Sequence, residues 1–160
     1  MSTLKVGTIQ DHANSTTAMT IDSGGRILQP EKPHIHVTKT DGHVGATSTI
    51  VWNNVIRDTE SAYNTSTGKY TIPAGLTGVW WFGVSVLAND TTYTEITLRV
   101  GAVGTFNARN QGQNNTNSTA SFSAAYYATA GDEISIRTES GSSLYGTGNP
   151  FSFWTGYFIG

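Results

Sequence analysis

The 160-residue sequence contains no cysteine, so neither a disulfide framework nor a thiolate metal site can stabilise it. Charged residues make up only 12% of the chain and the formal net charge is −2. This leaves no basic face for a nucleic-acid backbone and no polybasic membrane anchor. The first residues lack the apolar core of a signal peptide, and no segment approaches membrane-spanning length. We therefore predict neither nucleic-acid binding nor membrane insertion.

No segment shows a helical pattern either. The chain is rich in Thr, Ser, Asn and Gly, which favour turns and strand surfaces over helices. Apolar residues alternate with polar ones in short runs separated by turn clusters, which predicts an all-β protein. The strands expected in the main part of the chain are 34–38, 48–52, 69–72, 78–88, 93–100, 104–108, 119–128, 133–139 and 151–158. This many strands predict a sandwich.

The length fits one domain with an appendage, and the composition changes near the two prolines Pro30 and Pro33. We predict an N-terminal β-unit over residues 1–31 and a main domain over residues 32–160. The strands of the small unit have too few apolar residues to fold alone. Its apolar side chains need cover from the main domain or from another chain: Leu4, Val6, Ile9, Ile21 and Ile27.

Alternation in the strand 78–88 divides its aromatic residues between two faces. Trp80 and Phe82 fall on one face, which we expect in the core together with Tyr70, while Trp81 falls on the other. Further aromatic residues lie on the last strand, and we place Phe153, Trp154 and Tyr157 with Trp81 in an outward set. Large apolar patches are rarely left exposed on a monomer, so another surface should cover this set. A carbohydrate-binding platform is the alternative.

Four motifs occur in one order along residues 33 to 160. The first is a turn and short strand that ends at a proline, the second is a Gly-aromatic strand, the third is a Gly-Asp turn, and the fourth is a C-terminal aromatic-Gly segment. Their residues are Tyr63, Thr67, Gly68, Tyr70, Thr71 and Pro73, then Gly78, Trp80 and Phe82, then Gly131, Asp132 and Ile134, then Trp154, Gly156, Tyr157 and Phe158. This order resembles the complement-type globular head (C1q-like) domains of the tumour-necrosis-factor-like superfamily.

The resemblance implies an antiparallel jelly-roll sandwich that works as a homotrimer and binds rather than catalyses. It implies a trimer interface for the outward aromatic set. No collagen-like Gly-x-y stalk precedes the domain. Instead, the first 31 residues resemble a short β-unit of bacteriophage fibre and virion proteins, which attaches a distal domain to the particle.

Few residues offer catalytic or metal-binding chemistry. His34 and His36 would lie on one face of a strand at a spacing that can bind Zn or Cu, with His43, His12 or Asp41 as candidate third ligands. The alternative, which we favour, is that they are polar surface residues. The chain lacks a Gly-x-Ser-x-Gly elbow and a phosphate loop. We predict no catalytic residue, no metal and no cofactor.

These observations lead to one main hypothesis and one alternative. The main hypothesis is a trimeric structural protein of a phage-like virion, namely a capsid-decoration, head-fibre or tail-fibre component. Its partners would be other virion proteins, with host-surface glycans as candidate ligands of the knob, and its location would be the virion. The alternative is a soluble lectin-like recognition module that is not tied to a virion.

Overall fold

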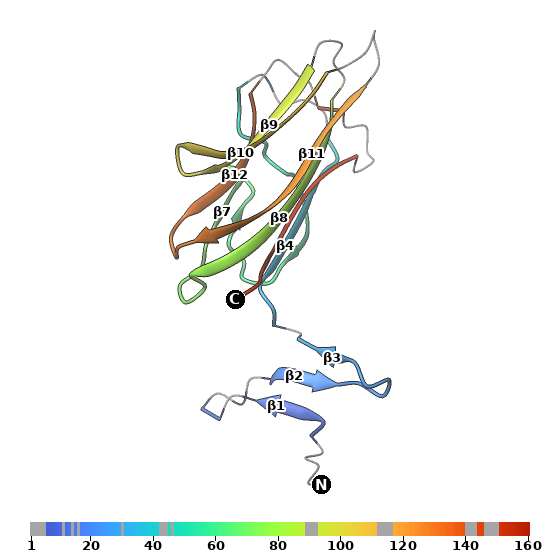
Figure 1. Cartoon of the computed structure of the whole chain (residues 1–160), viewed down its shortest axis with the longest axis vertical. Coiled ribbons are helices and arrows are strands. Elements are labelled where there is room, and N and C mark those ends of the chain that lie inside the picture. Colours follow the sequence, from blue (N-terminus) through green and yellow to red (C-terminus); the bar gives the residue numbers. More distant parts are fainter. Residues whose placement is uncertain are drawn as a thin grey trace. The chain divides into compact units, whose positions relative to one another are not determined.

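Every regular element that the structure describes is a β-strand (Figure 1). The computed structural model describes residues 6–10, 12–13, 15, 17–29, 31–41, 45, 47–88, 93–111, 117–139, 144–145 and 151–160. The chain divides into two compact units, Met1–Lys32 and Pro33–Gly160. Among the described residues, no helix is long and apolar enough to cross a bilayer.

The N-terminal unit is one antiparallel sheet in the order β1-β2-β3. Its strands are β1 (Thr8–Gln10), β2 (Thr17–Ile21) and β3 (Ile27–Leu28). Asp22 closes the turn between β2 and β3: its carboxylate accepts the backbone N–H groups of Gly24 and Arg26 and contacts the Arg26 guanidinium at 2.7 Å. The backbone hydrogen bond from Arg26, followed by its side chain, lowers the Asp22 pKa. Local contacts therefore fix this hairpin.

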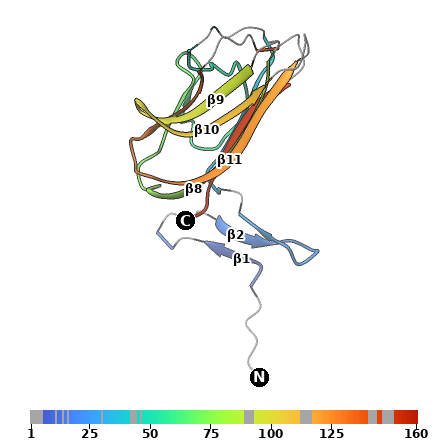
Figure 2. The ribbon, with the colours of Figure 1, turned by 45° about the horizontal axis from the view of Figure 1, so that its top comes forward.

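The second unit contains two five-stranded antiparallel sheets, seen as facing layers in Figures 1 and 2. The β8 sheet has the order β11-β8-β13-β4-β5, and the β9 sheet has the order β10-β9-β12-β7-β6. The strand bounds are β4 (His34–Lys39), β5 (Asn54–Asp58), β6 (Tyr63–Asn64), β7 (Lys69–Thr71), β8 (Gly78–Ala88), β9 (Tyr93–Val100), β10 (Val103–Gln111), β11 (Ser118–Ala128), β12 (Glu133–Thr138) and β13 (Ser152–Phe158). The prediction of an all-β antiparallel sandwich is confirmed.

One predicted strand is absent, and two observed strands, β5 and the two-residue β6, were not predicted. Residues 48–52 alternate like a strand, but Thr49 forms only an isolated bridge with Arg137. The Trp52 amide N–H donates to the Tyr63 hydroxyl at 2.8 Å, so it does not join a ladder. The strand lies just beyond, at Asn54–Asp58, where the apolar pair Val55-Ile56 gave no alternation.

Aromatic rings form a continuous row in the core between the two sheets. Trp80 of β8 packs edge-on against Tyr70 of β7 at 5.6 Å between ring centroids, and its indole N–H donates to the Leu76 carbonyl at 3.1 Å. The Trp80 ring also stacks on Phe82, which contacts Trp154 of β13 at 6.3 Å. All four side chains are buried. Burial raises the pKa of the Tyr70 hydroxyl, and the Asp58 and Glu60 charges raise it further.

The structure corrects the placement of Trp154, which the sequence analysis assigned to the outward set. Trp154 is fully buried. Strand β13 pairs Trp154 with Val84 of β8, whose side chain points into the core, so the neighbouring Phe153 and Thr155 point outward. Trp154 therefore belongs to the core of its own chain.

Gly68 lets the turn before β7 pass close to a neighbouring backbone segment. Its φ is +72°, a conformation that favours glycine. A Cβ at this position would lie 2.3 Å from the Ile50 carbonyl oxygen. Gly75 also has a positive φ, +85°, but a Cβ there would meet no atom within 4 Å. Gly75 is therefore required only for its backbone conformation, whereas Gly68 is required both for its conformation and for its close contact with Ile50.

We predict that Trp80→Ala destabilises the second unit by about 3–5 kcal/mol, the usual cost of deleting a buried ring from a core. Because this is a large share of a domain's stability, the variant should lose soluble folded protein. Trp80→Phe is the matched control, since it keeps an aromatic ring, and it should stay folded at a smaller cost. Thermal unfolding followed by circular dichroism measures both. A Trp80→Ala variant that melts within about 5 °C of the parent would contradict this packing.

We predict a different cost for alanine at the two turn glycines. Gly75→Ala should cost only the strain of a positive φ, about 1–2 kcal/mol. Gly68→Ala should cost that strain plus about 1–3 kcal/mol for displacing the Ile50 carbonyl. Denaturant unfolding of the two variants measures the difference. Equal losses at the two positions would show that the contact with Ile50 is unimportant.

Candidate interaction surface

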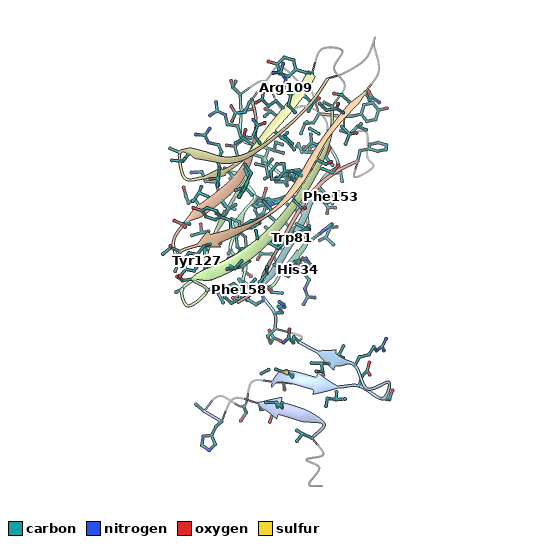
Figure 3. All side chains as sticks on the ribbon, in the orientation of Figure 1. His34, Trp81, Arg109, Tyr127, Phe153 and Phe158 are labelled. Atoms are coloured by element: carbon teal, nitrogen blue, oxygen red, sulfur yellow. The ribbon has the colours of Figure 1, made fainter. Side chains whose placement is uncertain are left out.

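The β8 sheet presents aromatic rings on the face that turns away from the core. Trp81 of β8 and Tyr157 of β13 are paired in register, and their rings stack at 5.2 Å. Phe153, further along β13, stacks on His36 of β4 at 6.1 Å. Figure 3 labels Trp81, Phe153 and His34 along this sheet. Phe153 and Tyr157 are 37% and 38% exposed in the single chain, so their rings lie open to a second surface.

Small residues create a shallow depression between Trp81 and Phe153. Its floor consists of Gly83, Ser85, Ser121 and Ser123 of the neighbouring strands β8 and β11. The Trp81 ring lies across Gly83, where a Cβ would sit 2.5 Å from its outer edge. The indole therefore lies flat along the sheet and leaves room beside it. This shape can receive a side chain or a strand edge of a partner.

Two imidazoles border the aromatic rings. His34 and His36 of β4 lie on the same face with ring centroids 6.5 Å apart, and a His34 ring nitrogen lies 3.2 Å from the Thr155 hydroxyl. Arg57 of β5 pairs in register with His36. Burial lowers the pKa of His34, and the charges of His36 and Arg57 lower it further. The face therefore favours the neutral form of His34 near pH 7.

Within the part of the chain that the structure describes, no third ligand lies beside the two histidines. Among the described residues, no group of three or more His, Asp or Glu side chains could hold a metal ion. Asp41 forms an ion pair with Lys39. His12 lies in the N-terminal unit, and His43 lies outside the described residues. His34 and His36 border the aromatic rings of this face.

The outer face of the β9 sheet has the opposite chemistry. Lys69 pairs with Glu133 at 2.7 Å, and Arg99 and Arg137 both lie near the Glu139 carboxylate, at 3.5 and 3.7 Å. Glu95 accepts a hydrogen bond from the Asn107 amide. The more exposed of these pairs, Lys69–Glu133, should contribute little to stability. The contrast makes the outer face of the β8 sheet the better interaction surface, because covering it desolvates few formal charges.

Part of this surface was missed by the sequence analysis. Ser121, Ser123 and Tyr127 of β11 share the face with Trp81, and Tyr127 is 63% exposed. Period-2 alternation within 119–128 was the signal that could have found them. Arg57 lies on the strand that the sequence analysis missed, and no local pattern marked it.

The Gly-Asp motif forms a turn. The Asp132 carboxylate accepts the Thr129 N–H at 2.8 Å, and Gly131 has a φ of +92°. Asp132 therefore stabilises the turn before β12, as aspartate commonly does.

The predicted attachment residues keep solvent-exposed surface where the structure describes them. Ile9, Ile21 and Ile27 are 52%, 49% and 65% exposed, and Val6 is partly buried. Leu4 lies outside the described residues. The three-stranded sheet thus carries several large apolar side chains that the unit itself leaves open.

Comparison with known proteins identifies the family of the second unit. Residues 35–159 match the C1q domain family. The globular domain of zebrafish complement 1qA has a TM-score of 0.66 at 15% identity, over 81% of this chain and 98% of that chain. Eiger TNF from S. frugiperda has a TM-score of 0.66 at 16% identity, over 81% and 93%. Murine APRIL at pH 5.0 has a TM-score of 0.64 at 10% identity, over 80% and 99%.

No curated protein matches the chain. The structural likenesses are below 25% identity and show the shared jelly-roll fold, while the sequence match covers most of the chain. The chain belongs to the C1q domain family.

Proposed function

We propose that this protein is a homotrimeric structural protein of a phage-like virion, in which the second unit forms an exposed knob and the N-terminal unit attaches it to the particle. The observation that supports the trimer is the outer face of the β8 sheet, where Trp81, Phe153 and Tyr157 are partly exposed over small residues. A closed trimer covers this face on every chain at once. The role of the knob is assembly and binding, not catalysis, in line with the C1q family.

Two features support attachment through the N-terminal unit. Its sequence resembles the short β-unit by which phage fibre and virion proteins join the particle. Its isoleucines Ile9, Ile21 and Ile27 remain exposed, so the unit needs an outside surface to cover them. Other virion proteins are the proposed partners. Host-surface glycans are candidate ligands of the knob loops, several of which lie outside the described residues.

We predict that the full chain is a trimer, with a mass three times the chain mass of 17.1 kDa. Burying the aromatic face should give an obligate-type interface above roughly 2,000 Å² in total. Light scattering at micromolar concentration measures the mass, and a stable monomer would contradict the proposal.

Two matched lysine variants, Ser123→Lys and Thr71→Lys, test which sheet face forms the trimer interface. Both residues are exposed hydroxyl side chains on strands, one on the outer face of the β8 sheet and the other on the outer face of the β9 sheet. Ser123→Lys should dissociate the trimer, because it buries an unpaired charge. Thr71→Lys should leave the mass unchanged.

We predict that deletion of residues 1–31 leaves a folded, trimeric knob that no longer joins the particle. The core aromatic rings all belong to the second unit, so its stability should not depend on the deleted residues. Occupancy on purified particles measures attachment, and fusion of the N-terminal unit to an unrelated trimer should restore recruitment. Normal occupancy of the truncated chain would place attachment in the jelly roll itself.

A further inference from the structure

The N-terminal sheet has one apolar face and one mainly polar face. Ile9 of β1 lies opposite Met19 of β2, and Ile21 of β2 lies opposite Ile27 of β3. Directly paired residues share a face, as do residues two apart, so these four side chains point to the same side. Thr8, Thr20 and Leu28 are paired on the other side. An apolar depression on the first face is lined by Ile9, Met19, Ile21 and Ile27 together with the preceding segment Val6, Gly7 and Thr8.

Among the residues of the unit that the structure describes, this face has no second layer. A sheet that is apolar on one face must bury that face against another element. The described strands have three, five and two residues, and all three belong to the one sheet. Three isoleucines consequently stay about half exposed or more. Their cover is therefore expected from outside the described part of the unit.

We propose that two sister copies of the same unit cover this face, so that three N-terminal units close into a small β-prism with a shared apolar axis. The inference rests on the proposed homotrimer. It makes the unit a second trimerisation element, and the closed prism, not a single sheet, is what meets the particle. The particle protein would then bind the strand edges and the other face of each sheet, which carries Thr8, Thr20 and Leu28.

The dimensions of the sheet suit three copies. Neighbouring strands are about 4.8 Å apart, so three strands make a side of roughly 14 Å. A triangle with that side places each sheet roughly 4 Å from the axis. Sheets that pack face to face are about 10 Å apart, so each lies about 5 Å from the midplane. The two distances agree, and inward isoleucines can therefore fill the axis.

The short connection to the knob and the uncharged lining of the apolar face both favour sister copies of the unit as its cover. Strand β3 ends at Leu28 and strand β4 begins at His34, so a trimeric knob would tether three units by short connections. Such tethers raise the local concentration of each unit around the others to the millimolar range. None of the described residues that line the apolar face is charged, and Asp22 and Arg26 form an ion pair with each other at the turn.

Single cysteines in the full-length chain test the proximity of the apolar faces, because the natural chain has no cysteine. Ile21→Cys should form inter-chain disulfides under mild oxidation, since its copies meet at the axis. At most two of three chains can couple, so the expected product is up to two thirds disulfide-linked dimer and one third single chain. Thr20→Cys, the adjacent residue on the other face, is the matched control and should not couple within the trimer.

Charge substitution tests the burial of the same face. Ile27 and Leu28 are neighbours on β3, are 65% and 46% exposed in the single chain, and point to opposite sides. In the full-length protein, Ile27→Asp should speed amide hydrogen exchange in β2 by at least about tenfold, the effect of losing about 1.4 kcal/mol of protection. Leu28→Asp should leave that exchange near the parent rate.

The outcomes separate this inference from the proposed trimer. If light scattering finds a monomer, the proposed function fails and the inference fails with it. If the mass is that of a trimer but Ile21→Cys does not couple, or couples no better than Thr20→Cys, the prism is overturned and the trimeric knob stands. Unchanged exchange in Ile27→Asp, or protection of β2 that appears only after particle protein is added, also overturns the prism.

Discussion

The contact between Trp80 and Tyr70 holds the two sheets of the knob together. Trp80 lies on the β8 sheet and Tyr70 on the β9 sheet, and their rings meet edge-on at 5.6 Å. Edge-to-face pairs contribute about 0.5–1.5 kcal/mol beyond the area that they bury. Trp80 also contacts Phe82 and Phe158, so one indole connects β7, β8 and β13. The chain has no cysteine, so packing rather than a disulfide joins the two layers, with the Tyr63–Trp154 and Phe106–Tyr126 ring pairs as further contacts between them.

Strand β8 couples the core to the proposed interface. Its alternation sends Trp80 and Phe82 inward and Trp81 outward, so a rigid core fixes the position of the outer rings. Tyr157 and Phe153 belong to β13, which pairs directly with β8. The interaction surface is therefore built on adjacent central strands rather than on loops. Such a surface changes little on binding, which reduces the entropy lost in association.

The fold and part of the site could be predicted from the sequence because strand alternation is a local property. It placed Trp80 in the core and Trp81 on the outer face correctly. In a strand with one buried face, a register shift by one residue would turn every side chain to the wrong side, so the alternation determines the register. It failed at Trp154, which directly follows the outward Phe153 and whose side is set by the pairing of β13 with β8. It failed again at 48–52, where the amide of Trp52 bonds to a side chain instead of a strand. Both failures come from contacts distant in sequence.

Which surface covers each apolar face is a property of the assembly, and no single chain encodes it locally. The knob has a large core and needs partners only for its outer rings. The described part of the N-terminal unit has no layer against which to bury Ile9, Ile21 and Ile27. In the proposed trimer, each knob would hold two copies of the same sheet near each unit. Three weak attachment sites joined in this way would bind far more tightly than one, because each later contact is intramolecular. Under the proposed function, the stable knob would set the local concentration of the N-terminal units, and the units would use that concentration for attachment.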